Sequence, residues 1–160
     1  MMVYLQLLFL IIVANGSPII GRWLLNGHWA KPIDGGAVFS DGRPILGTSK
    51  TYRGVACSLV GTLLAGALVG LSWKISLIVS ALAMVGDCLS SFVKRRLGYL
   101  SGAKAFGLDQ IPESLLPMLG LLNMLDVSAL GVGLTVVMFV VVELVLSFVG
   151  YKLHIRKHPY

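Results

Sequence analysis

The chain has 160 residues, of which 56% are hydrophobic and 12% charged, with a net charge of +6 and a mean hydropathy of +0.86. The charged share is about half the roughly 25% that is usual in globular domains, so the composition excludes an ordinary soluble domain. We expect one polytopic membrane domain over residues 1–160, with no nucleic-acid partner.

Five apolar segments predict an all-α protein with five transmembrane helices, since a helix needs roughly 20 residues to cross a bilayer. These spans cover about 3–25, 54–71, 75–94, 112–125 and 130–151, and the fourth is short. Most Lys and Arg residues follow the first span, the third span or the fifth, whereas Lys74 stands alone on the other side. The positive-inside rule therefore predicts a cell-membrane protein with its N-terminus outside and both long loops and its C-terminus in the cytoplasm.

Two spans carry features beyond their hydropathy. In the first, the stretch 15–18 reads Asn-Gly-Ser-Pro, which predicts an interrupted helix, either a simple kink or a break that lines a polar cavity. In the second, small residues recur at every fourth position, a pattern that lets another helix approach closely within the bundle or in a homodimer; they are Gly54, Ser58, Thr62, Gly66 and Gly70.

Asp87 lies inside the third span, where an unpaired carboxylate is costly and is a functional candidate by default. Lys94 shares its helix face but lies roughly 10 Å away along the axis, too far to pair with it. Two explanations stay open. Asp87 forms an ion pair with Arg95 or Lys50, or it holds a hard cation such as Mg²⁺ together with a second carboxylate. Asp109 is the natural second acid, and Glu113 is a weaker candidate because it equally suits a helix first turn.

The segment between the first two spans is rich in glycine and ends in basic residues. Lys50, Thr51 and Arg53 stand at the predicted start of the second span, where free backbone N–H groups and cations favour phosphate binding. The spacing does not fit a P-loop, because only two residues separate Gly47 from Lys50 and no strand precedes them. The alternative is a basic loop that touches lipid headgroups.

Acids and cations on one side of the membrane together indicate a metal-bound polyphosphate, because cations neutralise phosphate and acids hold the metal. Simple attraction of a phosphate would not need the acids. The combination favours phosphoryl or nucleotidyl transfer by positioning and electrostatics.

Several motifs resemble those of membrane CTP:phosphatidate cytidylyltransferases, and among them the archaeal CDP-archaeol synthase family. One runs Gly86-Asp87-x-x-Ser90-Ser91-x-x-Lys94-Arg95-Arg96, and it is followed by Asp109-Gln110-x-Pro112. The stretches 34–36, 41–43 and 47–54 complete the pattern, so the resemblance covers nearly the whole chain. Ile111-Pro112-Glu113-Ser114 replaces the Pro-Gly-His-Gly-Gly stretch of the bacterial and eukaryotic enzymes, which favours the archaeal ether-lipid branch.

The resemblance implies a Mg²⁺-dependent reaction in which CTP and a prenyl-ether glycerol phosphate give CDP-archaeol and pyrophosphate. Asp87 and Asp109 would hold the metal, and Lys94 would complete the catalytic set. The lipid phosphate would itself attack the α-phosphorus, so no general base is required. The implied substrate-binding residues are Asn15, Asp34, Gly35, Gly36, Arg43, Lys50, Thr51, Arg53, Ser90, Arg95 and Lys104.

Three other functions are less compatible with the residues. A CDP-alcohol phosphotransferase would need an Asp-x-x-x-Asp pair, which the chain lacks. A small anion transporter would place its polar residues at mid-depth within an internal repeat. A non-catalytic lipid-binding module would not need Asp87 and Asp109. The sequence assigns no role to Glu143.

Overall fold

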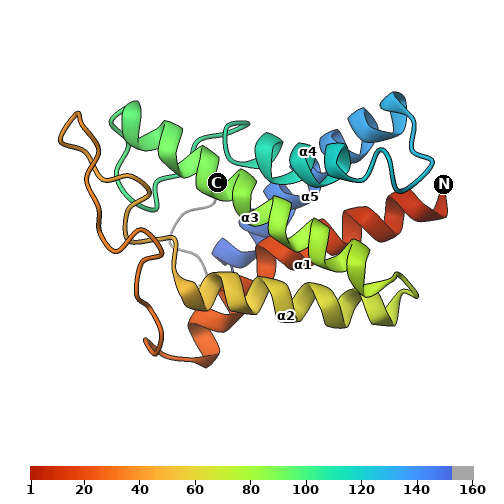
Figure 1. Ribbon diagram of the computed structural model, residues 1–160, viewed down its shortest axis with the longest axis horizontal. Helices are drawn as coiled ribbons and strands as arrows, with labels where there is room; N and C mark the ends of the chain where they lie inside the picture. The colour runs from red at the N-terminus through yellow and green to blue at the C-terminus, as the bar shows by residue number, and fades with distance from the viewer. Residues whose placement is uncertain (153–160) are drawn as a thin grey trace.

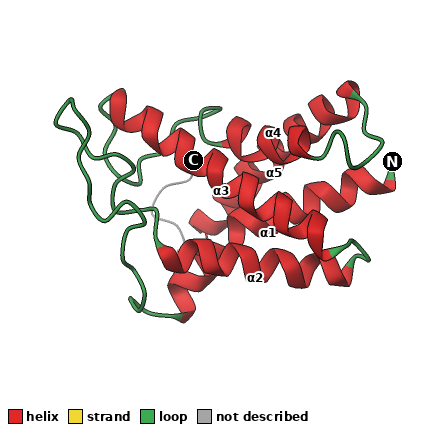
Figure 2. Ribbon diagram, viewed as in Figure 1, coloured by secondary structure: helices red, strands yellow, loops and turns green. Residues whose placement is uncertain are grey.

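The computed structural model describes residues 1–152, and in that part of the chain every regular element is a helix (Figure 2). The prediction of an all-α chain with five helices is therefore confirmed for these residues. The basic tail that contains Arg156 and Lys157 lies outside them. The helices are α1 (Met2–Leu24), α2 (Tyr52–Leu68), α3 (Trp73–Arg96), α4 (Gln110–Gly120) and α5 (Ala129–Lys152).

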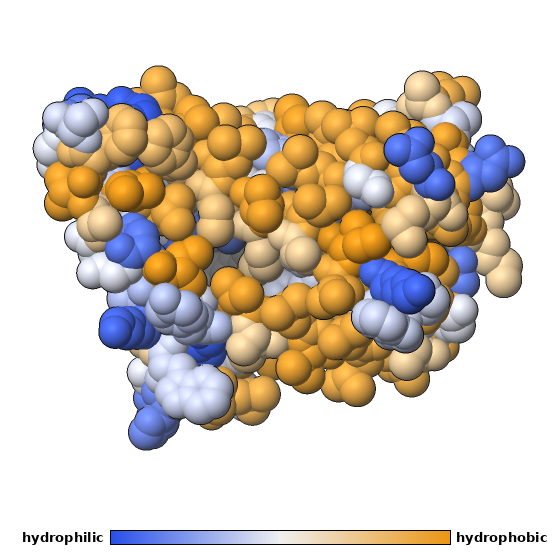
Figure 3. Space-filling model, viewed as in Figure 1, coloured by the Kyte–Doolittle hydropathy of each residue, from blue (hydrophilic) through white to orange (hydrophobic). Residues whose placement is uncertain are grey.

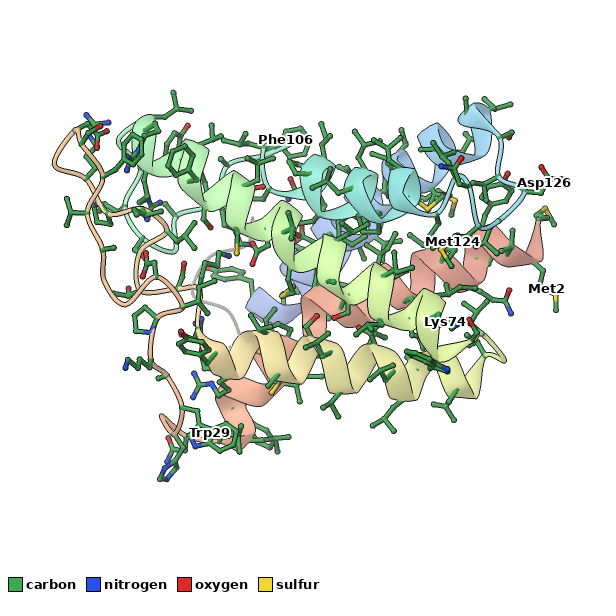
Figure 4. All side chains as sticks on the ribbon, in the orientation of Figure 1. Met2, Trp29, Lys74, Phe106, Met124 and Asp126 are labelled. Carbon is green, nitrogen blue, oxygen red and sulfur yellow. The ribbon has the colours of Figure 1, made fainter. Side chains whose placement is uncertain are left out.

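The helices run back and forth between two ends of the molecule (Figure 1). One end, which we call the loop end, holds the two long connections: loop 1, residues 25–51, and loop 2, residues 97–109. The opposite end holds the N-terminus, the α2–α3 turn and the α4–α5 connection, as the labels of Met2, Lys74 and Asp126 show, whereas Trp29 marks the loop end (Figure 4). The two long loops thus share one end, as the sequence predicts.

Three helices, α1, α3 and α5, are long and apolar enough to cross a membrane. The α2 helix is apolar but has only 17 residues, and α4 has 11, which at 1.5 Å per residue reach roughly 16 Å. The α4 helix is therefore shorter than the predicted segment 112–125. It is also shorter than the core of a bilayer, which is about 30 Å thick. The chain is a multi-pass membrane protein, and the count of five crossings stays a prediction.

The predicted break in the first span is wrong, because α1 continues through Pro18, whereas a kink at this proline stays a prediction. Two side chains bond to carbonyls one turn earlier: Asn15 Nδ2 donates to Ile11 O at 3.0 Å, and Ser17 Oγ donates to Val13 O at 2.7 Å. Such side-chain bonds help membrane helices to accommodate proline. Asn15 is thus occupied by its own helix rather than standing at a break.

Small residues of α2 are covered within the chain. The hydroxyls of Ser58 and Ser80 form a 2.9 Å hydrogen bond between α2 and α3, and Gly66 lies directly against Ser76. The small-residue pattern therefore serves packing inside the bundle, and a homodimer stays a prediction. The apolar core lies toward the end opposite the loops and includes Leu7, Leu10, Ile11, Val79, Met118 and Phe139.

Candidate active site

Asp34 organises loop 1. Its carboxylate accepts hydrogen bonds from the backbone N–H groups of Gly36, Leu46 and Gly47 at 3.0, 2.9 and 3.1 Å. Gly36 and Gly47 have positive φ angles of 83° and 86°, a conformation that glycine adopts without strain. The resemblance implies that Asp34 and its glycines bind substrate, which stays a prediction. In the structure the Asp34 carboxylate ties together both halves of the loop.

The pKa of Asp34 is lowered from its usual 3.8 as the net result of two opposing effects. Burial acts to raise it, but the hydrogen bonds from Gly36, Leu46 and Gly47 favour the charged form and outweigh burial. The loop is thus built around an ionised carboxylate.

Loop 1 is attached to the C-terminal end of α3. The Arg43 guanidinium donates to the carbonyl oxygens of Arg95 and Arg96, which lie in the last turn of α3, where carbonyls lack partners within the helix. Arg96 in turn binds the Asp41 carboxylate at 2.9 Å and stacks on the Phe39 ring. Arg43, a predicted pocket residue, therefore acts in this structure by fixing the loop to the helix.

The first N–H groups of α2 are occupied, so the prediction that they are free for phosphate is wrong. Tyr52 N donates to Lys31 O and Arg53 N to Trp29 O, while Thr51 Oγ1 caps the helix by accepting from Gly54 N at 3.2 Å. The Arg53 side chain is buried and donates to the His28 carbonyl. These partners come from loop 1, which local sequence patterns do not place.

Asp87 pairs with Lys50. The Lys50 Nζ lies 2.5 Å from Asp87 Oδ1, and the two side chains are 17% and 22% exposed. One of the two explanations that the sequence left open for Asp87, an ion pair with a basic residue of another segment, is therefore observed. The pair joins the end of loop 1 to the middle of α3 and leaves the second carboxylate oxygen for other partners.

Glu113 of α4 is the other neighbour of Asp87, and the two carboxyl groups lie close enough to affect each other's charge. The contact depends on Gly86, because a Cβ there would collide with the backbone carbonyl of Pro112. Two carboxyl groups in contact cannot both ionise unless a proton or a cation lies between them. Glu113 thus belongs to the centre of the site, although its position in a helix first turn made it only a weak candidate from sequence.

A second buried ion pair joins Lys94 to Asp109. The Lys94 Nζ lies 2.6 Å from Asp109 Oδ1 and also donates to the Ala103 carbonyl at 2.8 Å. The other oxygen of Asp109 accepts from the backbone of Ala105 at 2.9 Å. Each predicted metal-binding aspartate is therefore neutralised by a lysine that was itself predicted to belong to the site, Lys50 for Asp87 and Lys94 for Asp109.

Arg95 has donors to spare. It is only 4% exposed, and its Nη2 donates to Leu100 O at 2.6 Å, but its Nε and Nη1 have no hydrogen-bond partner. Buried donors without partners cost free energy, and Nη1 lies close to Gly47 of loop 1. Arg95 thus has buried donors that can bind an anionic group.

Two hydrogen bonds connect α5 to the site. Gln110 Nε2 donates to Glu143 Oε2 at 2.6 Å, and Lys104 Nζ donates to Ser147 Oγ at 2.9 Å. The sequence left Glu143 without a role and gave Lys104 a role toward phosphate. Gln110 was missed, although its three-residue spacing from Glu113 places both on one face of α4.

Ser90 has a local role. It is buried, and its hydroxyl donates to the Gly86 carbonyl one helical turn earlier at 2.9 Å. Ser90 therefore lies beside the acids without facing an open site.

Taken together, α3 carries Asp87, Lys94 and Arg95 on its loop-end half, with loop 1 on one side and loop 2 with α4 on the other. Hydrophilic side chains lie at both ends of the visible face, including this one, and apolar side chains cover the middle of the molecule (Figure 3). The fold and site define a multi-pass membrane protein with a polar, charge-rich centre at its loop end, which is suited to an anionic ligand.

Comparisons with known proteins agree with that class. A family model described as "CarS-like: CDP-archaeol synthase" matches residues 1–160. A CDP-archaeol synthase of Pyrobaculum aerophilum is 33% identical, with 92% of each chain covered, and one of Sulfurisphaera tokodaii is 37% identical, with 93% of this chain and 90% of the relative covered. The chain belongs to the CDP-archaeol synthase family of enzymes, as the sequence motifs predict.

A solved structure supports the same assignment at the level of the fold. It is described as an intramembrane enzyme for archaeal membrane lipids biosynthesis, with a TM-score of 0.73 and 27% identity. The match covers 88% of this chain and 90% of that one.

Proposed function

We propose that the protein transfers a cytidylyl group from CTP to an archaeal prenyl-ether glycerol phosphate, giving CDP-archaeol and pyrophosphate. Membership of the family supports the reaction. The observation that carries it in this structure is the arrangement of two Lys–Asp pairs and an unsatisfied Arg95 around the loop-end half of α3. Such a site can exchange its internal ion pairs for a polyphosphate and its counter-cation.

The reaction is proposed to require a Mg²⁺ ion, although among the described residues no group of three or more acids, histidines or cysteines is placed to hold a metal by itself. Carboxyl oxygens near Asp87 suit such an ion when phosphate oxygens complete its ligands. Asp87 and Glu113 present carboxyl oxygens to each other, and Mg²⁺ prefers such hard oxygen ligands together with phosphate oxygens. We propose that Asp87 and Asp109 hold the ion, with Glu113 next to them. When bound, the ion would neutralise charge on the triphosphate.

The lysines have the complementary role. Binding of a metal to Asp87 and Asp109 would free Lys50 and Lys94 from their present partners. Both are then available to neutralise phosphate oxygens, and Arg95 supplies two unused donors. Lys104, from loop 2, contributes a further cation near α5.

The lipid phosphate is the nucleophile. One of its anionic oxygens attacks the α-phosphorus of CTP, the bond from that phosphorus to the β-phosphate oxygen breaks, and pyrophosphate leaves with the electron pair. Because the nucleophile is already an anion, the chain needs no general base and acts by positioning and charge stabilisation. Thr51 and Arg53 hold the start of α2, and Asp34, Gly35, Gly36 and Arg43 shape loop 1 over the nucleotide.

We further propose that the loop end faces the cytoplasm, where CTP is present. The loop end carries most of the Lys and Arg residues, whereas Lys74 lies at the opposite end (Figure 4), which follows the positive-inside rule. An anion transporter is not favoured, because the charged groups gather at one end rather than at mid-depth.

The test is pyrophosphate release by the purified protein in detergent with CTP, Mg²⁺ and a digeranylgeranylglyceryl phosphate. We expect release that requires the lipid and falls at least about 100-fold in Asp87→Asn and in Asp109→Asn, because each removes an electrostatic contact to the reacting groups. Asp126→Asn is the matched control, since this exposed acid lies at the opposite end (Figure 4). Lipid-independent release, or equal activity in all three variants, would contradict the proposal.

A further inference from the structure

Glu143 is an acid inside an apolar, membrane-spanning helix. It is the one acid in the sequence 129–152 that forms α5, and at 1.5 Å per residue it lies roughly 14 Å along the axis from Lys152. An ionisable side chain at such a position is costly and is a functional candidate by default. The proposed reaction assigns no role to it.

Gln110 connects Glu143 to loop 2. Its Nε2 donates to Glu143 Oε2 at 2.6 Å, and its Oε1 accepts from the Gly107 backbone N–H at 2.8 Å. Because an ionised carboxylate offers only acceptors and a backbone N–H is only a donor, these two neighbours fix which way the Gln110 amide points. Gln110 is buried, so water does not readily replace either bond.

The bond from Gln110 to Gly107 lies within a turn that also holds Asp109. In this turn Asp109 Oδ2 accepts from Ala105 N at 2.9 Å, and Asp109 N donates to Ala105 O at 3.1 Å. With Oδ2 held by the turn, Oδ1 is directed to Lys94 Nζ, which is 2.6 Å away. The orientation of the Asp109 carboxylate therefore depends on the shape of this turn.

A second contact between α5 and loop 2 lies one helical turn after Glu143. Lys104 Nζ donates to Ser147 Oγ at 2.9 Å, and Ser147 is buried. Residues four apart share one face of a helix, so Glu143 and Ser147 form one polar strip on α5. The two contacts flank the turn 105–109, one through Lys104 before it and one through Gln110 after it.

Side-chain contacts of this kind determine the shape of loop 2, because the described residues 97–109 contain no regular helix or strand. On the α3 side, Lys94 binds the Ala103 carbonyl and Arg95 the Leu100 carbonyl. On the opposite side, the polar strip of α5 holds the turn.

We infer that Glu143 is a positioning residue, which orients Asp109 through Gln110 and the turn 105–109. The consequence for catalysis rests on the proposed function, in which Asp109 holds the metal. Groups that orient a metal-binding side chain from behind typically change metal affinity or activity by about 10- to 100-fold when they are removed.

A direct role for Glu143 makes a different prediction. Glu143 lies close enough to Glu113 to act on its charge, so the competing role is that of a further acid of the site. A positioning residue needs only an oxygen that accepts from Gln110, whereas a further acid needs the negative charge. Glu143→Gln keeps the oxygen and removes the charge, and Glu143→Leu removes both.

The first test observes loop 2 without turnover, by amide hydrogen exchange of the purified protein in detergent. We expect the Ala105 and Gly107 amides to exchange at least about tenfold faster in Glu143→Leu, and within about threefold of the wild type in Glu143→Gln, because only the first loses the hydrogen bond. The Gly47 amide, which Asp34 holds in loop 1, is the internal control. Unchanged exchange of loop 2 in Glu143→Leu, or equal acceleration in both loops, would overturn the inference.

The second test measures pyrophosphate release as the Mg²⁺ concentration is varied. We expect Glu143→Leu and Gln110→Leu each to raise the Mg²⁺ concentration for half-maximal release by about tenfold, with the KM for CTP at saturating Mg²⁺ within about twofold. The double variant should be no worse than either single variant, because both substitutions break the same chain of contacts. Glu143→Gln should stay within about threefold of the wild type.

Two results of the second test would overturn the positioning role. Equal losses in Glu143→Gln and Glu143→Leu would show that the charge matters rather than the acceptor oxygen. Additive losses in the double variant would show that Glu143 does not act through Gln110. A wild-type protein that releases no pyrophosphate would refute the proposed function alone, and hydrogen exchange would still decide whether Glu143 holds the turn.

Discussion

At the scale of single residues, the charges of the site neutralise one another in pairs. Asp87 and Lys50 form one pair, Asp109 and Lys94 the other, and Glu113 adds a third carboxyl group beside Asp87. A buried ion pair contributes little net stability, but removal of one partner is costly, because the other charge remains unpaired. The pairs are therefore suited to hold the empty site together and to be exchanged when charged ligands enter.

Lys50→Met tests this exchange. The substitution leaves Asp87 and Glu113 in contact without their cation, and we expect it to lower the free energy of unfolding by about 2 kcal/mol in EDTA. Mg²⁺ should then raise the melting temperature of the variant more than that of the wild type, because the ion replaces the lost charge. Thermal unfolding in detergent with and without Mg²⁺ measures both effects. Lys74→Met, at the opposite end, is the control, and an equal Mg²⁺ response in all three proteins would contradict a metal at Asp87.

Asp34 gives a prediction about pH. Its pKa is lowered in the folded protein by the hydrogen bonds from Gly36, Leu46 and Gly47, which outweigh burial. The stabilisation is therefore fully present above the unfolded pKa of 3.8 and is lost as the pH falls through the lower, folded value. Amide exchange of Leu46 and Gly47, corrected for intrinsic rates, should show protection that disappears over that acidic range. The Ile45 amide, which donates to the Ala37 carbonyl, should lose protection at the same pH in the wild type, and all three should lack it at neutral pH in Asp34→Ala.

At the scale of elements, the close approach of α3 and α4 determines which acids meet. Gly86→Ala places a methyl group against the Pro112 backbone, and such overpacking costs about 1–3 kcal/mol. We expect the helices to separate, Glu113 to move away from Asp87, and pyrophosphate release to fall at least about tenfold. Gly133→Ala in α5 is the matched control, because its new methyl group has no neighbour within 4 Å. Full activity in Gly86→Ala would show that the α3–α4 contact does not position the site.

The elements also show where sequence reasoning succeeds and where it ends. Hydropathy is sufficient to predict five helices, and the distribution of Lys and Arg to place both long loops at one end. The prediction of free N–H groups at the start of α2 is wrong, because loop 1 folds back and its Lys31 and Trp29 carbonyls accept hydrogen bonds from them. Likewise, the prediction of a break before Pro18 is wrong, because the Asn15 and Ser17 side chains donate hydrogen bonds to carbonyls of α1 itself. Both errors involve partners that become visible only when side chains and loops are placed.

The site itself was predicted in part. The pairing of Asp87 with Lys50 was one of two open alternatives, since a charge at membrane depth needs a partner. Glu113 was underestimated, because an acid in a helix first turn has an ordinary explanation in the helix dipole. Only the contact between Gly86 and Pro112, which is long-range in the chain, reveals that this acid faces Asp87.

At the scale of the whole molecule, the question is whether all five helices cross the membrane. By length and hydropathy, three of the helices that the structure describes are able to cross: α1, α3 and α5. Yet α2 and α4 also run between the two ends, so the α2–α3 turn and the α4–α5 connection lie together opposite the loops (Figure 1). If α2 or α4 failed to cross, one of these turns would lie on the same side of the membrane as the loops.

Single cysteines decide this arrangement. In a Cys57→Ser, Cys88→Ser background, Ser40→Cys and Ser101→Cys report on the loop end, and Lys74→Cys and Asp126→Cys report on the other end. All four positions are exposed. A membrane-impermeant maleimide should label the loop-end pair only in inside-out vesicles, because cationic loops remain cytoplasmic, and the other pair only in right-side-out vesicles. Labelling of the Lys74 position on the same side as Ser40, with Ser101 labelled on the opposite side, would mean that α2 does not cross while α3 does. Labelling of the Asp126 position together with the loop-end pair, with Lys74 still on the other side, would mean that α4 does not cross, and the short α4 would then be a re-entrant element that presents Glu113 to Asp87.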